Sequence, residues 1–150
     1  MRSLKEFVFY IQENKIVCVE PSRAQNLIFP KNQMPMIPLL EKSLCFAARI
    51  VKLYQYLSNE KKESVISKQI IWSGTSIGAN ANEAAYGVSQ ADFISKMQIA
   101  LKETAETEYW LKLLLLSDYL DEKLAQSLIN DCLEIKRILI ASLKTAKESK

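Results

Sequence analysis

Residues 72–87 read WSGTSIGANANEAAYG, a stretch that combines a helical spacing with an unusual share of small side chains. The spacing of three and four residues begins upstream at Ile66 and predicts a helix over residues 63–86, which Gly87 ends. The predicted inward stripe of this helix consists of Ile66, Ile70, Ser73, Ile77, Asn80 and Ala84.

Gly74 and Gly78 lie one helical turn apart inside this predicted helix. An interior glycine destabilises a helix by about 1 kcal/mol relative to alanine, so the close approach of a second helix is expected to compensate. A phosphate-binding glycine loop would need a preceding strand and a following Gly-Lys-Ser/Thr, and the sequence has neither. We therefore predict that both glycines serve helix packing. Asn80 is expected to face the core, where it needs a hydrogen-bond partner and fixes register or assembly.

The same periodicity predicts three further helices, over residues 39–58, 89–117 and 122–147. Ser89 and Asp92 have the spacing of a capping box at the start of the second of these. Short connections between long helices predict an all-α fold, an antiparallel up-down-up-down four-helix bundle. In the helix over 39–58, the stripe expected to face inward is Leu40, Leu44, Ala47, Val51 and Tyr54.

Residues 1–38 differ from the rest because they hold all four prolines and no helical period. We predict a non-helical N-terminal extension over 1–38 and the bundle over 39–150. Within the extension, residues 7–11 and 16–20 are β-branched and aromatic runs that suggest a hairpin docked on the bundle or on a neighbouring subunit. The alternative is an extended or disordered arm.

The chain contains no histidine, the commonest general base and metal ligand. Cys18, Cys45 and Cys132 are far apart and odd in number, which fits neither a disulfide framework nor a zinc site. We expect a protein without enzymatic activity, catalytic residues, metal or cofactor. No apolar run approaches the ~20 residues that span a bilayer, and no signal-peptide pattern is present, so a cytoplasmic protein without a membrane partner is expected.

Three glutamates cluster in the helix over 89–117. Glu103 and Glu106 share one face, and paired carboxylates suit acid–base chemistry or a bridged metal pair. The di-iron pattern of helical bundles requires Glu-x-x-His, however, so a solvated face is the preferred interpretation. Glu108 lies nearer the inward stripe and is expected to be half-buried against a cation or a hydroxyl group.

Trp72 stands among polar residues and is expected on the outside of an isolated bundle. Exposed tryptophans are typical of interfaces. Tyr86, Tyr109 and Trp110 enlarge the apolar surface of neighbouring helices, and we predict that these four aromatic residues contribute to a subunit interface.

The formal net charge of +3 is too small to indicate nucleic-acid binding on its own. In a ring of subunits, however, symmetry repeats any basic patch, and affinity for phosphates grows with each cation presented. The candidate nucleic-acid contacts are Arg49, Lys68, Lys96 and Lys102.

Over residues 39–146 the chain resembles a known bacterial family. Its two long motifs include SGTSIGAN at 73–80 and IALKE at 99–103 followed by ETEYWL at 106–111, with Glu83, Ala84, Ser89, Asp92, Phe93 and Lys96 between or beside them. They resemble the four helix bundle proteins called 23S rRNA intervening-sequence proteins, also labelled S23 ribosomal proteins.

The resemblance implies an antiparallel four-helix bundle that assembles as a ring-like homopentamer. It also implies a similarity to the accessory variability determinant of diversity-generating retroelements, a basic pentamer that binds nucleic acid and its reverse transcriptase. The chain departs from the pattern at Trp72, where many members carry arginine, and near Asn82, where many carry a charge. Both departures weaken the nucleic-acid interpretation and leave the fold untouched.

Two functions therefore remain open. The first is a homo-oligomer, expected to be a pentamer, that binds RNA or DNA through repeated weakly basic surfaces. The second is an interaction scaffold that docks a protein partner on the ring or on residues 1–38.

Overall fold

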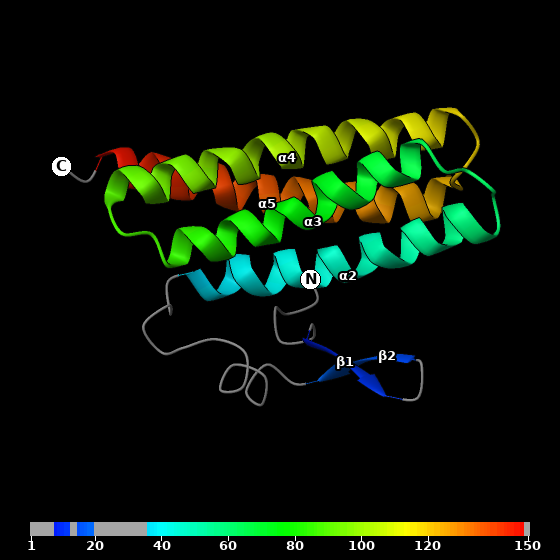
Figure 1. Cartoon of the computed structure of the whole chain (residues 1–150), viewed down its shortest axis with the longest axis horizontal. Helices are drawn as coiled ribbons and strands as arrows, with labels where there is room; N and C mark the ends of the chain where they lie inside the picture. The colour runs from blue at the N-terminus through cyan, green and yellow to red at the C-terminus, as the bar shows by residue number, and fades with distance from the viewer. Residues whose placement is uncertain (1–7, 13–14, 20–35, 149–150) are drawn as a thin grey trace.

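The computed structural model describes residues 8–12, 15–19 and 36–148. Four helices form an antiparallel bundle with short connections, and they run alongside one another over most of their length (Figure 1). The neighbouring pairs are α2 with α3, α3 with α4, α4 with α5, and α5 with α2. The helices are α2 (Ile37–Asn59), α3 (Ile66–Ala85), α4 (Gln90–Leu116) and α5 (Glu122–Glu148). The predicted all-α four-helix bundle is confirmed.

Side-chain caps start α4 and α5. The backbone N–H of Asp92 donates to Ser89 Oγ over 3.1 Å, and the N–H of Val88 donates to Asp92 Oδ2 over 3.2 Å, so the predicted capping pair starts α4. At the start of α5, the N–H of Leu124 donates to Asp121 Oδ1 over 2.9 Å. These bonds satisfy N–H groups that have no partner inside the helix.

Glu63 starts α3 in a way that the periodicity did not reveal. Its Oε1 accepts from the N–H of Val65 and of Ile66, each over 2.8 Å, and its Oε2 accepts from the N–H of Ser67 over 2.7 Å. Burial alone would raise the pKa of Glu63, but these backbone donors together lower it. The helix therefore begins at Ile66, three residues later than predicted, because Glu63 caps it from outside.

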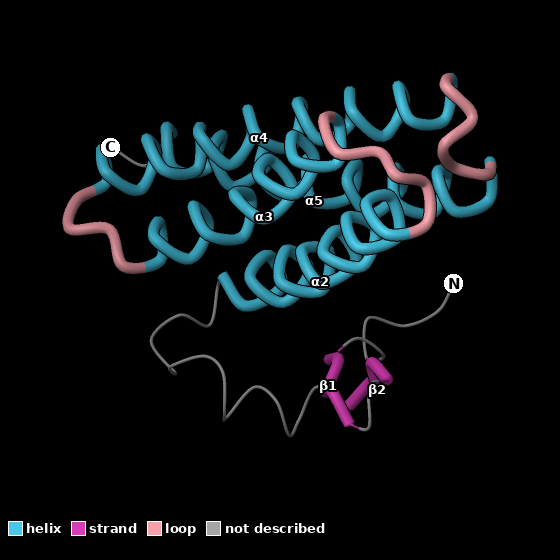
Figure 2. The backbone as a smooth tube through the Cα atoms, turned by 45° about the vertical axis from the view of Figure 1, so that its right-hand side comes forward, coloured by secondary structure: helices cyan, strands magenta, loops and turns pink. Residues whose placement is uncertain are grey.

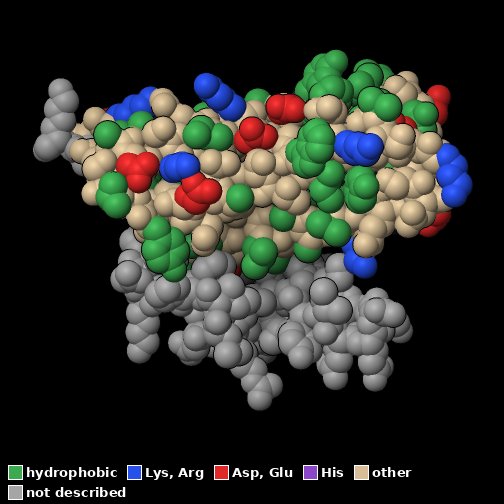
Figure 3. All heavy atoms as spheres, in the orientation of Figure 1, with side chains coloured by type: hydrophobic (Ala, Val, Ile, Leu, Met, Phe, Trp, Pro, Cys, Tyr) green, Lys and Arg blue, Asp and Glu red, His purple; other side chains and the backbone are tan. Residues whose placement is uncertain are grey.

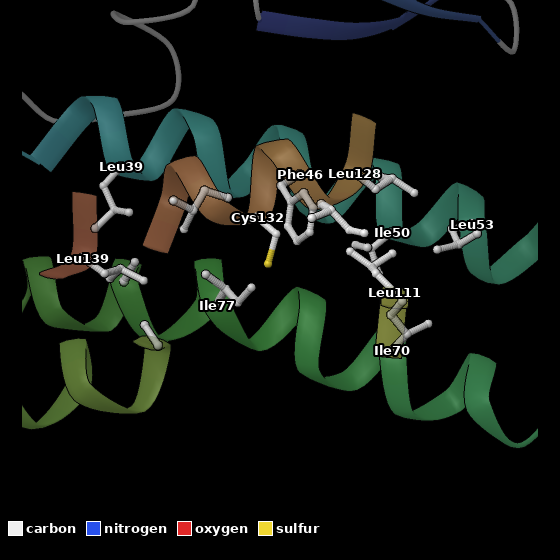
Figure 4. Packing of buried hydrophobic residues seen from close by; sticks show 14 of the residues in the cluster. Leu39, Phe46, Ile50, Leu53, Ile70, Ile77, Leu111, Leu128, Cys132 and Leu139 are labelled. Atoms are coloured by element: carbon white, nitrogen blue, oxygen red, sulfur yellow. The ribbon is translucent and has the colours of Figure 1, made fainter. Parts of the chain in front are cut away.

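The hydrophobic core lies along the axis of the bundle, and all four helices contribute to it (Figure 4). Phe46 and Ile50 of α2 point towards Ile70 and Ile77 of α3 and towards Leu111 of α4. The α5 contribution includes Leu128, Cys132, Ile135 and Leu139, each fully or almost fully buried. This core holds the outward faces of the helices in fixed positions relative to one another.

The predicted inward stripe of α2 is wrong in its register. Leu44 is 50% exposed and Val51 is also exposed, although both were expected inside. Ser43 and Phe46 are buried instead. Helix α2 carries apolar residues at a spacing of three and four on two of its sides. The spacing alone does not indicate which of these sides packs against the other helices. The buried residues of α2 are Ile37, Leu39, Leu40, Ser43, Phe46, Ile50, Leu53 and Leu57.

The two interior glycines of α3 lie against α2. A Cβ atom on Gly74 would stand 2.9 Å from both Cγ1 and Cγ2 of Ile50, and one on Gly78 would stand 3.2 Å from Ser43 Oγ. A side chain at position 74 would therefore push α2 away from α3, whereas a methyl group at position 78 would need Ser43 to move by only a few tenths of an ångström. This geometry is consistent with the predicted role of Gly74 and Gly78 in close helix packing.

Asn80 finds its partner within its own helix. Its Nδ2 donates to the carbonyl oxygen of Ser76 over 2.8 Å, and the residue is half-buried. A hydrogen bond between α3 and α4 is made instead by Thr107 Oγ1, which donates to Ser73 Oγ over 3.0 Å in the core. The polar link that fixes α3 against α4 is thus a pair of hydroxyl groups, and the amide of Asn80 makes no such link among the described bonds.

Two strands precede the bundle, β1 (Val8–Gln12) and β2 (Lys15–Val19). They pair in antiparallel register, with Tyr10 opposite Val17, which agrees with the hairpin alternative. The hairpin lies beside α2 in both backbone views (Figures 1 and 2), and β1 approaches that helix. Residues 20–35 of the predicted extension lie outside the described residues.

Candidate functional site

Helix α4 presents two outward surfaces, one towards α3 and one towards α5. The Ser73–Thr107 hydrogen bond and the ion pair of Lys96 with Glu83 fix α3 on one side. On the other side, Cys132 Sγ donates to the carbonyl oxygen of Thr104 over 3.3 Å. Because successive residues of a helix are turned by about 100°, these contacts fix which side chains of α4 lie on each surface.

We define the α3–α4 face as Trp72, Ile99, Glu103, Glu106 and Trp110. Trp72 is 63% exposed, as expected for an isolated bundle. Burial, followed by the negative charge of Glu106, raises the pKa of Glu103. Lys96 and Glu83 pair with each other at the edge of this face, and the exposed Lys68 lies one turn before Trp72, so the unpaired charges on this side are the two α4 carboxylates and one lysine. Figure 3 shows this side of the molecule, where hydrophobic side chains alternate with charged ones of both signs.

We define the α4–α5 face as Lys102, Tyr109, Lys112, Lys136, Arg137, Ile140 and Lys144. Glu108 lies within it, with only 14% of its side chain exposed, and accepts from Lys112 Nζ over 2.6 Å and from Lys136 Nζ over 2.9 Å. The hydrogen bond from Lys112 lowers the pKa of Glu108 most, and the one from Lys136 lowers it further. Burial acts in the opposite direction and raises it. The expected half-buried contact of Glu108 with a cation is confirmed.

Helix α5 separates its charges by side. Its acidic residues Asp131 and Glu134 turn to α2, where they pair with Arg49 and with Lys42. The cations of the α4–α5 face turn the other way. Between Gln126 and Lys144, within the described helix, the α5 positions that turn towards α4 carry no carboxylate. The α4–α5 face therefore has an excess of positive charge that the small net charge of the chain conceals.

The structure does not bring the four predicted nucleic-acid residues together. Arg49 holds α2 to α5, since it pairs with Asp131 and its Nη2 donates to Ser127 Oγ over 2.9 Å. Lys96 is engaged with Glu83, which raises the lysine's pKa. Lys68 and Lys102 are exposed, and neither forms an ion pair with the described residues. Only Lys102 lies on the α4–α5 face.

The four predicted interface aromatics also divide. Tyr109 and Trp110 pack edge to face, with ring centroids 4.9 Å apart, and Trp110 Nε1 donates to Glu106 Oε1 over 3.1 Å. Tyr86 follows α3 as its C-cap and lies 14 residues beyond Trp72, about 21 Å along the axis. The predicted subunit interface therefore has no single aromatic patch, and its location stays a prediction.

Sequence reasoning overlooked Lys112, Lys136, Arg137 and Lys144 as members of one surface. Two of them carry a usable signal, because Arg137 and Lys144 are seven residues apart and so lie on one side of α5. The residues that α4 adds to this basic surface could be identified only once it was known which side of α5 packs against α4. That information comes from the Thr104–Cys132 and Glu108–Lys136 contacts.

The buried thiol of Cys132 is chemically unreactive. Burial, and then the nearby charge of Glu108, raises the pKa of the Cys132 thiol to about 12, so this sulfur stays protonated at neutral pH. Within the described ranges no group of three His, Cys, Asp or Glu side chains is arranged to hold a metal ion. Nor does any described helix combine the length and the apolar character that a membrane crossing needs.

Residues 37–141 match the family model of the 23S rRNA-intervening sequence protein. The chain belongs to this family. The match begins at the first residue of α2 and ends within α5, so it covers the bundle and leaves out the hairpin. The predicted resemblance is thereby confirmed.

A solved structure extends this result to the fold of the family. A protein of unknown function from the S23 ribosomal protein family of Bacteroides thetaiotaomicron is 53% identical, with a TM-score of 0.72. The similarity covers 73% of this chain and 97% of that one. No curated protein matches the chain. The similarity to the accessory variability determinant stays a prediction.

Proposed function

We propose that this 23S rRNA-intervening sequence family member is a cytoplasmic, non-enzymatic homo-oligomer, with five copies as the expected number, that binds RNA or DNA through the α4–α5 face. The observation that carries the proposal is that Lys102 of α4 and Arg137 and Lys144 of α5 share this face without a paired carboxylate among the described residues. The name of the family, with its reference to 23S rRNA, is consistent with an RNA ligand.

Phosphate binding suits this face physically. Each cation that neutralises a phosphate releases condensed counterions, and the resulting affinity falls steeply with salt. Lys112 and Lys136 share one carboxylate, Glu108, so this cluster adds a further positive charge to those of the three other cations. In a ring, the same surface recurs once per subunit, which multiplies a weak contact into a strong one.

Assembly is supported by the apolar surface that the isolated bundle leaves open. Trp72 on α3 and Leu116 at the end of α4 are 63% and 82% exposed. Tryptophan is enriched at the centres of subunit interfaces because it buries a large area. The carboxylates of Glu103 and Glu106 disfavour phosphate on the α3–α4 face, which leaves this face available for contacts between subunits.

The test is light scattering after size exclusion, at low and at high salt, with and without a mixed pool of structured RNA and duplex DNA. A pentamer whose mass increases with nucleic acid at low salt and not at high salt supports the proposal. A pentamer that is indifferent to nucleic acid at both salts contradicts the binding function, and a monomer contradicts the assembly.

A second candidate is a scaffold for a protein partner, favoured by the exposure of Trp72 beside the acidic pair Glu103 and Glu106. A partner with basic and apolar side chains would fit that face. Pull-down with the intact chain, with residues 1–38 deleted and with Trp72→Ala separates the cases. A partner lost only with Trp72→Ala places docking on the α3–α4 face, and one lost only with the deletion places it on the extension.

A further inference from the structure

The α4–α5 face is not only basic, because exposed apolar side chains lie between its cations. Tyr109 is 58% exposed and Ile140 is 50% exposed. Leu133 is half-buried and packs against the core beside them. A surface that binds only the phosphates of a duplex has no use for such side chains, since the base faces of a duplex are stacked inside. This mixture suits a ligand that presents phosphates and open base faces together.

Tyr109 is placed to receive a base. It follows Lys102 by seven residues and precedes Lys112 by three, so cations flank it on the same side of α4. The axial separation from Lys102 is about 10.5 Å. The tyrosine ring is already ordered, because Trp110 packs against it edge to face and is itself held by the hydrogen bond to Glu106. Binding would therefore lose little side-chain entropy at this position.

Helix α5 adds further cations to the same face, beside Lys102 and Lys112 of α4. Arg137 and Lys144 are seven residues apart on the side of α5 that faces α4, again about 10.5 Å along the axis. Arg137 Nε donates to the carbonyl oxygen of Leu133 over 3.2 Å, which orders the stem of the side chain. Its other guanidinium N–H groups make no described contact, so they remain for an acceptor such as a phosphate.

We propose that the α4–α5 face binds a single-stranded polynucleotide, with phosphates over Lys102, Arg137 and Lys144 and a base stacked on Tyr109. This inference rests on the proposed nucleic-acid function and specifies its ligand and its site. Stacking on an aromatic ring tolerates any base, so sequence preference is expected to be weak. The shared chemistry of single-stranded RNA and single-stranded DNA satisfies the site, and the experiment compares the two.

The experiment measures fluorescence anisotropy of labelled single strands of oligoadenylate RNA and oligodeoxyadenylate DNA, with an unlabelled duplex as competitor, on the full chain. The double variant Arg137→Glu/Lys144→Glu is expected to weaken binding at least tenfold at low salt and to flatten the salt slope by about 0.7 for each phosphate that is no longer neutralised. Tyr109→Ala is expected to weaken it by about fivefold or more. The duplex is expected to compete poorly.

Two matched controls locate the effect. Lys52→Glu/Lys61→Glu makes the same change in net charge at exposed positions in α2 and in the connection to α3, and is expected to change affinity by about twofold at most, because distant charges are screened. Tyr86→Ala removes a tyrosine of matching exposure, 59%, at the end of α3 and away from this face, so it is expected to leave the affinity of the intact oligomer unchanged. Light scattering and circular dichroism of each variant establish that assembly and helix content are kept.

The outcomes separate this inference from the function on which it rests. Equal losses in the control and test variants overturn the site while leaving nucleic-acid binding intact. A duplex that binds as tightly as the single strand, with Tyr109→Ala unaffected, overturns the single-stranded ligand. Dissociation of the oligomer by Tyr109→Ala assigns that residue to the subunit interface and overturns the stacking role. Absence of any binding by the natural chain at low salt overturns both proposals.

Discussion

Helices α3 and α5 both pack between α2 and α4, yet they are attached by different means. On the α3 side, Gly74 lies against Ile50, and Ser73 meets Thr107 through hydroxyl groups. On the α5 side, the links that reach α2 and α4 include three ion pairs, those of Arg49 with Asp131, Lys42 with Glu134 and Lys136 with Glu108, whereas the α3 side has one, that of Lys96 with Glu83. The α3 side depends mainly on shape, whereas the α5 side adds more interhelical charge pairs to its apolar core.

The difference explains where the basic surface forms. Close contacts such as that of Gly74 with Ile50 leave no room for long side chains, so the α3 side carries few charges across its contacts. The boundaries of α5 accommodate long side chains, and its acidic residues are used to hold α2. The cations of α5 that remain then face outward beside α4. The predictions below test this contrast, from the largest expected effect to the smallest.

The close contact of Gly74 with Ile50 is expected to dominate. Ile50→Ala should lower the free energy of unfolding by about 2–5 kcal/mol, because it opens a cavity in a fully buried site. Gly74→Ala should lower it by about 1–2 kcal/mol, since overpacking exceeds the gain in helix propensity. In the double variant the new methyl group occupies part of the cavity, so urea unfolding should show a loss smaller than the sum. Gly78→Ala is the matched control and should be close to neutral, because its nearest neighbour is the hydroxyl of Ser43.

Glu108→Gln should lower the free energy of unfolding by about 1–2 kcal/mol at neutral pH, because it removes the charge that Lys112 and Lys136 contact. The pKa of Glu108 is lowered in the folded state, so its carboxylate stabilises the fold above the unfolded pKa and loses that effect as the pH falls through the folded one. Urea unfolding across pH 7 to 3 should show the two proteins converging below 4.5, the usual value for glutamic acid. A difference that is constant over this range would contradict the charge-based account.

The hydroxyl pair between α3 and α4 should have an intermediate effect. Thr107→Val leaves Ser73 Oγ without its interhelical donor and is expected to destabilise the protein by about 1 kcal/mol. Adding Ser73→Ala removes the unsatisfied hydroxyl group as well, so the double variant should recover part of the stability lost in Thr107→Val. Thermal unfolding of the two single variants and the double variant measures this coupling, and strict additivity would show that the pair contributes nothing.

The Arg49–Asp131 pair should have the smallest effect, because 29% and 41% of the two side chains are exposed. Arg49→Gln is expected to lower the free energy of unfolding by about 0.2–1 kcal/mol at low salt and by less at high salt, where the pair is screened. Urea unfolding at two salt concentrations measures it. An effect as large as that of Ile50→Ala, or one that is independent of salt, would show that the α5 side is not held by charge in the way described.

Most of the fold could be read from the sequence because each helix carries its own signals. The spacing of three and four residues located all four helices within three residues of their observed ends, and Ser89 with Asp92 marked the start of α4 correctly. The small residues at Gly74 and Gly78 indicated close packing, and Glu108 was expected against a cation. Each of these inferences needs only local chemistry and the geometry of a single helix.

The register of α2 and the composition of the basic face could not be read in this way. Leu44 and Val51 are as apolar as the residues that α2 buries, so hydrophobicity does not distinguish its covered side from its open one. Arg49 and Lys96 resembled candidate phosphate contacts until their partners, Asp131 and Glu83, were known. An ion pair between helices joins residues far apart in the chain, so no local sequence pattern predicts it.

The sequence by itself determined four helices, their order, the cap of α4 and a core with close packing at α3, because those properties depend on neighbours within a few residues. The tertiary structure alone decided which cations remain outward. That outcome depends on which side of α5 meets α2 and which meets α4, and therefore on contacts between residues that are distant in the chain. The same amino acids, paired differently across the helices, would carry the same net charge and present another surface.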